Sequence, residues 1–242
     1  MLSKYLPVFV ILAILSEILG TVGGFGSSVY FVPIANFFLD FQSVLGITAL
    51  FHLSSNVTKI AFFKKGLDKN LILTLGIPAI VFVSVGAYFS KFLDPKLLTY
   101  FLGFFLIGLS LLFLIFKQLR VNSNTKSAII GGSLSGLSAG ILGTGGAIRG
   151  ITMAAFKMNK DKFIATSAVI DLGVDLSRTI VYFLNGYIHQ HDLYLIPILI
   201  VVGIFGTWIG KKILNRISQD QFRKFVLFLI LGIGIVSVVI NV

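Results

Sequence analysis

Residues 70–90 read NLILTLGIPAIVFVSVGAYFS, a run of 21 residues without one charged side chain. Lysines stand at both ends of it, at Lys69 and Lys91. A helix that crosses the hydrocarbon core of a bilayer needs about 20 mostly apolar residues. The run therefore predicts a membrane-spanning helix that ends in charged loops.

Similar apolar segments lie on both sides of this run. Together they fall at about 5–23, 27–39, 42–63, 70–90, 96–116, 127–146, 147–157, 162–184, 193–210 and 222–240. Eight approach the length of a spanning helix, whereas 27–39 and 147–157 are too short and follow glycine clusters. The expected fold is an all-α polytopic membrane protein with about eight long transmembrane helices and two short broken or re-entrant helices.

The composition agrees with a membrane domain over the whole chain. Hydrophobic residues make up 56% of the 242 positions, charged residues only 12%, and the mean hydropathy is +0.99. Soluble domains carry about 25% charged residues to keep their surfaces wetted. The net charge of +11 sits in loops, not on an amphipathic face with interleaved aromatic residues, which argues against a nucleic-acid partner. The absence of cysteine excludes disulfides and thiolate chemistry.

The N-terminal run from Lys4 to Leu15 resembles the start of a signal peptide. It lacks a small-residue cleavage site, and the chain continues into Glu17 and a glycine cluster. We therefore expect it to be retained as the first span.

Basic residues cluster in the loops that alternate segments would place on one side. Lys4, Lys91 and Lys96 fall on the other side. Because basic loops stay in the cytoplasm, the clusters predict a multi-pass protein with both termini outside the cytoplasm. The clustered residues are Lys64, Lys65, Lys69, Lys117, Arg120, Lys126, Lys157, Lys160, Lys162, Lys211, Lys212, Arg216, Arg223 and Lys224.

A shift of about 120 residues brings the sequence onto itself. Residues 20–26 match 140–146, and residues 52–59 match 171–178. Each half, 1–120 and 121–242, then holds five segments, and this odd number predicts that the second half is inverted relative to the first. Inverted repeats with interrupted helices are typical of secondary transporters, whose solute site lies near the bilayer midplane.

Six charged residues fall within or beside apolar segments, where each costs about 2.5–3.5 kcal/mol on insertion scales. They are Glu17, Lys59, Arg149, Asp171, Asp175 and Arg178. The spacing of His52, Asn56 and Lys59 places them on one helix stripe, and 171, 175 and 178 repeat that spacing. We expect Lys59 and Arg178 to face a common centre and to neutralise an anionic solute.

The two glycine clusters supply backbone donors to the same expected site. Unwound amides and the N-terminal ends of the short helices can hold an anion. The candidates are Gly24, Gly26, Gly145 and Gly146, together with the hydroxyl groups of Ser27 and Thr144.

Structural roles for these charges stay open. Arg178 has Asp175 and Asp171 as alternative ion-pair partners, and Arg149 could instead reach an interface. Glu17, Asp171, Asp175 and His52 are candidates for proton coupling, although a packing or hydrogen-bonding role is equally compatible with Glu17 and His52. His189 and His191 fall in an expected exposed loop and receive no role.

These residues resemble the TauE/SafE family of sulfite and sulfonate exporters over nearly the whole chain. The resemblance rests on residues 52–59, 142–149 and 175–178, and on the pair Thr166-Ser167 that follows the second short segment. Thr48 is a looser match to the same pair in the first half. Ser27-Ser28 departs from the family, where a glycine is common. The resemblance implies anion export or uptake across the plasma membrane without ATP, with Thr48, Thr166 and Ser167 near the site.

The resulting hypothesis is an alternating-access secondary transporter for a small anion such as sulfite or a sulfonate, with proton coupling as an option. An anion channel and an intramembrane lipid-phosphate enzyme are the rival classes. No hydrolase elbow, zinc-protease pair or Walker loop occurs, and neither a cofactor nor a metal is expected. The sequence leaves open whether the chain works as a homodimer. We expect Lys59→Ala to abolish transport in a folded protein.

Overall fold

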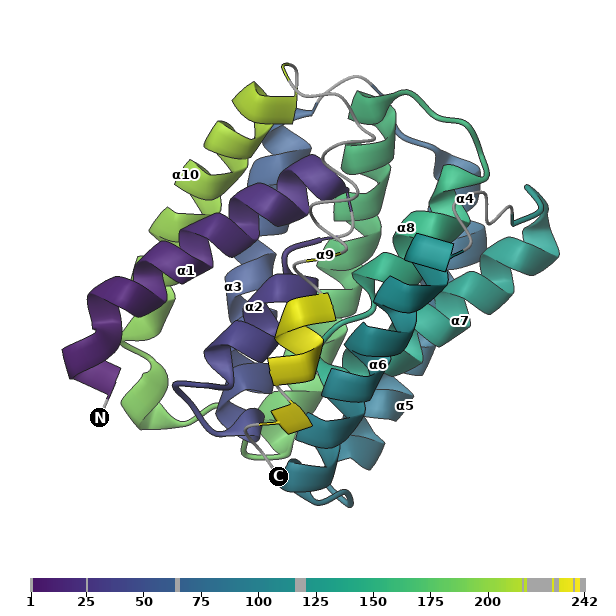
Figure 1. Cartoon of the computed structure of the whole chain (residues 1–242). Helices are drawn as coiled ribbons and strands as arrows, with labels where there is room; N and C mark the ends of the chain where they lie inside the picture. The colour runs from purple at the N-terminus through teal and green to yellow at the C-terminus, as the bar shows by residue number, and fades with distance from the viewer. Residues whose placement is uncertain are drawn as a thin grey trace.

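The computed structural model describes residues 2–24, 26–63, 66–115, 121–214, 216, 228, 231–236 and 238–239, and all regular structure within them is helical (Figure 1). The helices are α1 (Leu2–Gly23), α2 (Ser28–Ala35), α3 (Phe41–Phe62), α4 (Lys69–Leu71), α5 (Ile77–Ser90), α6 (Pro95–Ile115), α7 (Thr125–Leu142), α8 (Gly146–Ala154), α9 (Lys160–Leu184) and α10 (Leu195–Leu214). A π-helical stretch, Ile72–Gly76, joins α4 to α5, and a 3-10 turn, Gln190–Asp192, precedes α10.

Part of the expected pattern lies outside the described residues. The last expected segment, 222–240, is described only at 228, 231–236 and 238–239, which are helical. Other positions used above also lie outside: Phe25, Lys64, Lys65, Lys117, Arg120, Arg223 and Lys224.

The charge-free run at 70–90 is helical throughout, as expected. Four described helical stretches are long and apolar enough to cross a membrane: Lys4–Gly23, Lys69–Ser90, Pro95–Leu112 and Leu195–Leu214. By length and composition these make the chain a multi-pass membrane protein. The long helices α3, α7 and α9 are not among these four, because they carry polar residues and glycines that lower their hydropathy. The total of eight spans therefore stays a prediction.

The two short expected segments are short helices. The eight-residue α2 follows Gly26, and the nine-residue α8 follows Gly143. These glycines have φ values of +80° and +74°. Such left-handed conformations are readily adopted by glycine and rarely by other residues, so each glycine cluster ends one helix and redirects the chain into the next.

Asparagine and aspartate caps set the starts of three long helices. Asp40, Asn124 and Asn159 each accept a hydrogen bond from the backbone N–H three residues later, at 2.8–2.9 Å. These bonds satisfy amides that have no acceptor within the helix. The caps fix where α3, α7 and α9 begin, and thereby how many turns from the helix start each polar side chain lies.

Helix pairs form the core of the bundle. α1 packs on α10, α5 packs on α7, and α3 packs on α9 between these two pairs (Figure 1). Glycines permit the close approach: a Cβ on Gly206 would lie 2.7 Å from the side chain of Glu17, and one on Gly136 would lie 2.2 Å from the carbonyl oxygen of Ala79. The polar helices α3 and α9 are thus shielded by apolar ones.

Large apolar side chains cover the outer faces of the bundle. Phe92, Phe104 and Ile115 are each more than half exposed, as is Phe205 on α10. An apolar exterior of this extent is unfavourable in water and suits contact with lipid tails.

Contacts between loops define the two ends of the bundle. At one end Lys162 lies 2.9 Å from Asp68, and Lys211 donates to the carbonyl oxygen of Phe62 at 2.6 Å. At the other end the Tyr187 hydroxyl lies 3.3 Å from the Ser90 hydroxyl. Lys162 and Lys211 thus lie at one end of the bundle beside Asp68 and Phe62, as the alternation of loops predicts.

Candidate functional site

Three ion pairs form a charged centre inside the bundle. All three cations are at least 94% buried. Each lies against a different acid: Lys59 against Glu17 (2.7 Å), Arg178 against Asp175 (2.7 Å), and Arg149 against Asp171. Six charges that would each be costly in lipid are therefore neutralised in pairs.

This pairing settles the alternatives left by the sequence. The Asp175–Arg178 pair is confirmed. Asp171 instead receives two contacts from Arg149, so its assignment to Arg178 is wrong. Arg149 is 2% exposed and does not extend to an interface. Lys59, which has no carboxylate on its own helix, finds Glu17 on α1.

The Glu17 carboxylate is fully buried and accepts several hydroxyl hydrogen bonds in addition to the Lys59 contact. The shortest come from Ser27 at 2.5 Å and Ser55 at 2.6 Å, followed by Thr207 at 3.0 Å and Thr21 at 3.3 Å. Donors to an ionised carboxylate stabilise the charge. Glu17 thereby joins α1, α3, α10 and the first glycine break.

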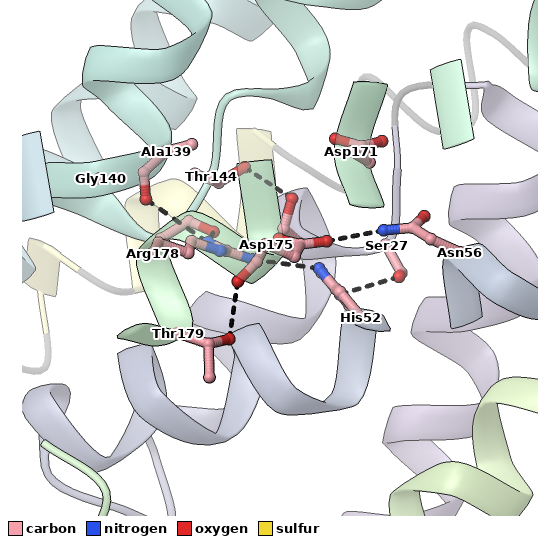
Figure 2. A network of polar contacts seen from close by, with 12 residues as sticks. Ser27, His52, Asn56, Ala139, Gly140, Thr144, Asp171, Asp175, Arg178 and Thr179 are labelled. Carbon is pink, nitrogen blue, oxygen red and sulfur yellow. Dashed lines mark hydrogen bonds and ion pairs between the residues drawn. The ribbon is translucent and has the colours of Figure 1, made fainter. Parts of the chain in front are cut away.

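A directed chain of hydrogen bonds connects the Arg178 pair to the Glu17 pair, and Figure 2 shows its part from Arg178 to Ser27. Arg178 Nη2 lies 3.3 Å from Nδ1 of His52, and His52 Nε2 lies 3.0 Å from the Ser27 hydroxyl. Arginine only donates, so Nδ1 must accept and the ring proton sits on Nε2. His52 then donates to Ser27, and Ser27 donates to Glu17.

Asn56 links the two central helices. Its Nδ2 donates to Asp175 Oδ2 at 2.6 Å (Figure 2). The other carboxylate oxygen of Asp175 faces Arg178, so both oxygens of this buried acid are satisfied.

The second glycine break is held by Arg178 and by serines of α7. Arg178 Nη1 donates to the carbonyl oxygen of Gly143 at 2.8 Å, at the end of α7. Ser135 and Ser138 donate to the carbonyl oxygens of Gly145 and Thr144. Cations are favourable at a helix C-terminus, so Arg178 stabilises the break as well as its acid. Arg178 Nε is buried and finds no acceptor among the described residues.

Two small cavities meet at this centre. One is lined by Arg149, Arg178, Gly145 and Gly146 among others, and the second by Gly24 and Ser167 among others. Three residues line both: Gly26, Lys59 and Asp171. Lys59 and Asp171 thus lie at the junction of the two cavities.

Most of the expected site residues line one of these cavities. They are Gly24, Gly26, Ser27, His52, Asn56, Lys59, Gly145, Gly146, Arg149, Ser167, Asp171, Asp175 and Arg178.

Four expected residues line neither cavity. Thr166 accepts a hydrogen bond from the backbone of Asp68, and Thr144 donates to Ser28 at 3.3 Å. Thr48 is fully buried, and its hydroxyl finds no partner among the described residues. Glu17 contacts three residues that line the cavities: Lys59, Ser27 and Thr21.

Three hydroxyl groups at the centre were not expected: those of Thr21, Ser55 and Thr207. Ser55 stands one helical turn before Lys59 and accepts a 2.8 Å hydrogen bond from its ammonium group, so helical spacing could have identified it. Thr21 is likewise one turn after Glu17. Thr207 lies 190 residues from Glu17, and no local pattern connects the two.

The fold and this centre define an all-helical, multi-pass membrane protein whose charged residues are gathered inside the bundle. The sequence model of the sulfite exporter TauE/SafE family matches residues 9–237, so the chain belongs to that family. It is similar to a probable membrane transporter protein of Methanocaldococcus jannaschii, with 28% identity over 254 residues that cover 94% of this chain and 93% of the relative. No solved structure matches the chain. The protein is thus a membrane transporter by family, as the resemblance in the sequence predicts.

Proposed function

We propose that this protein is a secondary transporter that moves a small anion, such as sulfite or a sulfonate, across the plasma membrane by alternating access. The observation that carries the proposal is the cavity lined by Lys59, Arg149 and Arg178 beside the two glycine breaks. Buried cations and helix N-termini are the groups that bind anions in proteins. Family membership supports transport, and the family's description supports sulfite as the first substrate to test.

Arg149 and Arg178 are the proposed substrate contacts in the first cavity. Arg178 Nε has a donor to spare, and the amides that begin α2 and α8 lack acceptors within their helices. A sulfur oxyanion offers several acceptor oxygens and could satisfy both kinds of donor at once.

The balance of charge at the centre favours coupling to protons. With all six groups ionised, the three pairs sum to zero. An added monoanion would leave one uncompensated negative charge in a buried site, which is costly unless a proton enters with it. Asp171 is the proposed proton carrier because its side chain is 18% exposed, against 0% for Glu17 and 4% for Asp175.

Lys59 and Asp171 are the proposed gate between the two cavities, since both line each of them. When a proton neutralises Asp171, Arg149 loses its counter-charge and becomes available to the anion. Movement of Lys59 away from Glu17 would then change which cavity the bound anion can leave through.

The packing pattern supports two inverted halves. α1 and α7 begin the two halves, and each packs on the long helix that precedes the other half's last segment: α1 on α10, and α7 on α5. α3 and α9 occupy equivalent positions and pack on each other. Such symmetry offers two related closures of one central site, which alternating access requires.

Counterflow in proteoliposomes tests the proposal. Vesicles loaded with unlabelled sulfite should transiently accumulate labelled sulfite from outside. The paired variant Arg149→Gln with Asp171→Asn, which leaves no unpaired buried charge, should abolish accumulation. Lys69→Gln, at the exposed first residue of α4, is the control and should behave as the wild type.

Flux without counterflow would replace the transporter by an anion channel. No sulfite flux from folded wild-type protein, with counterflow of another anion, would keep the mechanism and change the substrate. Normal counterflow in the paired variant would remove Arg149 and Asp171 from the site.

A further inference from the structure

A second cluster of ligand-type side chains lies at the opposite end of the bundle from the basic loops. It sits in the loop between α9 and α10, on the 3-10 turn Gln190–Asp192 and the residue before it. One donor atom from each of His189, His191 and Asp192 lies within 4.8 Å of the others. None of these residues lines the two central cavities.

Asp192 is buried without sufficient hydrogen bonds. The residue is only 2% exposed, and its Oδ2 finds no donor among the described residues. Two imidazole nitrogens lie near the carboxylate: His189 Nδ1 is 3.7 Å from Oδ2, and His191 Nε2 is 3.5 Å from Oδ1. A buried carboxylate oxygen without a donor is costly, so a cation bound at this position would stabilise the loop.

Ser43 and Asp40 set the tautomer of His189. The Ser43 hydroxyl donates to Asp40 at 2.7 Å and lies 2.7 Å from His189 Nδ1. Since the carboxylate of Asp40 accepts the hydroxyl proton, Nδ1 of neutral His189 is the donor to Ser43, and the ring lone pair is on Nε2. Hydrogen bonds of this kind orient metal-binding histidines and raise their basicity.

We propose that His189, His191 and Asp192 form a binding site for a divalent transition-metal ion of the Zn²⁺ type. Two imidazoles and one carboxylate suit Zn²⁺, which commonly takes three protein ligands and leaves a further position to water. Mg²⁺ and Ca²⁺ prefer oxygen ligands and fit this set poorly. The ion would give the orphaned oxygen of Asp192 the positive partner that the protein itself does not supply.

Ligation requires one local adjustment. The two imidazole rings lie nearly parallel, with centres 5.2 Å apart, whereas one ion must lie close to both ring planes. The side chain of His191 is 74% exposed and can turn toward the ion. His189 is held by Ser43, so we expect the larger movement in His191.

The site would fasten the α9–α10 loop to the start of α3. Asp40 and Ser43 belong to the α3 cap, and the backbone of Tyr187 already lies close to Gly46 of α3. Because α3 and α9 carry the charged centre, an ion here would restrain both central helices at one end of the bundle.

Metal binding to the purified full chain tests the site. The protein would carry an affinity tag without histidine, be stripped with a chelator, and be dialysed against Zn²⁺ or against Mg²⁺ at equal concentration. Elemental analysis should find about one Zn²⁺ per chain and no Mg²⁺. The melting temperature should rise with Zn²⁺ concentration, because the ion binds only the folded loop.

Two variants and one control separate the outcomes. His191→Ala removes an exposed ligand, and Asp192→Asn keeps the shape of the buried one; each should lose bound Zn²⁺ and the thermal shift. Gln190→Ala, at the exposed position between the histidines, should keep both. Equal Zn²⁺ content in all four proteins, or no Zn²⁺ in the wild type, would overturn the proposal.

Discussion

Arg178 donates from Nη2 to Nδ1 of His52 across 3.3 Å, and this contact makes His52 an acceptor on that side. The ring is therefore neutral, with its proton on Nε2 directed at Ser27. His52 acts as a relay between two ion pairs. Both of its ring nitrogens are already engaged in hydrogen bonds, which leaves neither free to take up a further proton.

Replacement of His52 should distinguish a relay from a proton carrier. Glutamine offers one acceptor and one donor, so His52→Gln should keep transport within about tenfold, in line with the loss of a neutral hydrogen bond. His52→Leu offers neither and should lose transport, because Arg178 and Ser27 are left unpaired. Sulfite counterflow in proteoliposomes measures both. Equal loss in the two variants would favour a titrating histidine.

Lys59 and Glu17 should tolerate joint neutralisation better than single changes. Lys59→Ala leaves the carboxylate of Glu17 buried without its cation, which typically costs about 3–5 kcal/mol. We therefore expect Lys59→Ala to unfold at a lower temperature, and not only to lose transport. The pair Lys59→Met with Glu17→Gln should restore the melting temperature in detergent while transport stays absent. Restored transport would remove Lys59 from the substrate path.

The Asn56–Asp175 contact should be exchangeable. Asn56→Asp alone sets two carboxylates at 2.6 Å, and Asp175→Asn alone removes the partner of Arg178. Each single variant should lower the melting temperature and transport. The double variant Asn56→Asp with Asp175→Asn restores one amide and one carboxylate and should recover stability. A purely additive loss in the double-variant cycle would contradict direct coupling between α3 and α9.

The Asp68–Lys162 pair should make the basic end of the bundle sensitive to acid. The hydrogen bond from Lys162 is the main reason that the pKa of Asp68 lies below its ordinary value of 3.8. The stabilisation is present above that ordinary pKa and is lost as pH falls through the lower folded-state pKa. Both side chains are partly exposed, so the effect is at most about 1 kcal/mol.

Thermal melting from pH 7 to pH 3 measures this effect. Asp68→Asn should melt slightly below the wild type at pH 7, and the gap should close at the acid end. A gap that is constant over the whole range would contradict a stabilising role of the ionised Asp68 carboxylate, which also accepts from the backbone of Leu71.

Close packing of α7 on α5 gives a steric prediction. A Cβ on Gly136 would lie 2.2 Å from the carbonyl oxygen of Ala79, whereas one on Gly108 of α6 would meet nothing within 4 Å. Gly136→Ala should lower stability by about 1–3 kcal/mol through overpacking. Gly108→Ala is the matched helix-interior control and should be neutral, or stabilise by up to about 1 kcal/mol. Equal melting temperatures would contradict the packing of these two helices.

Local sequence determined where the described helices lie. The charge-free run at 70–90 is helical because an apolar run of that length must satisfy its backbone hydrogen bonds internally. The two glycine clusters likewise predicted the short helices, since the left-handed residues Gly26 and Gly143 interrupt the chain at those points. Both properties depend on residues that are adjacent in the chain, so they can be read without a tertiary structure.

The partners of the buried charges were decided by tertiary structure, apart from pairs one turn apart such as Asp175 and Arg178. Glu17 meets Lys59 because α1 and α3 both pack on α10, and Arg149 meets Asp171 because α8 packs on α9. The spacing of the sequence placed the cations on particular helix faces, but it could not predict which face of another helix packs against each of them. Asp192 shows the same limit: its burial and its two imidazole neighbours arise only when the α9–α10 loop folds against α3. Which helices pack together depends on shape complementarity and contact energies over the whole bundle, and these cannot be read from residues that are adjacent in the chain.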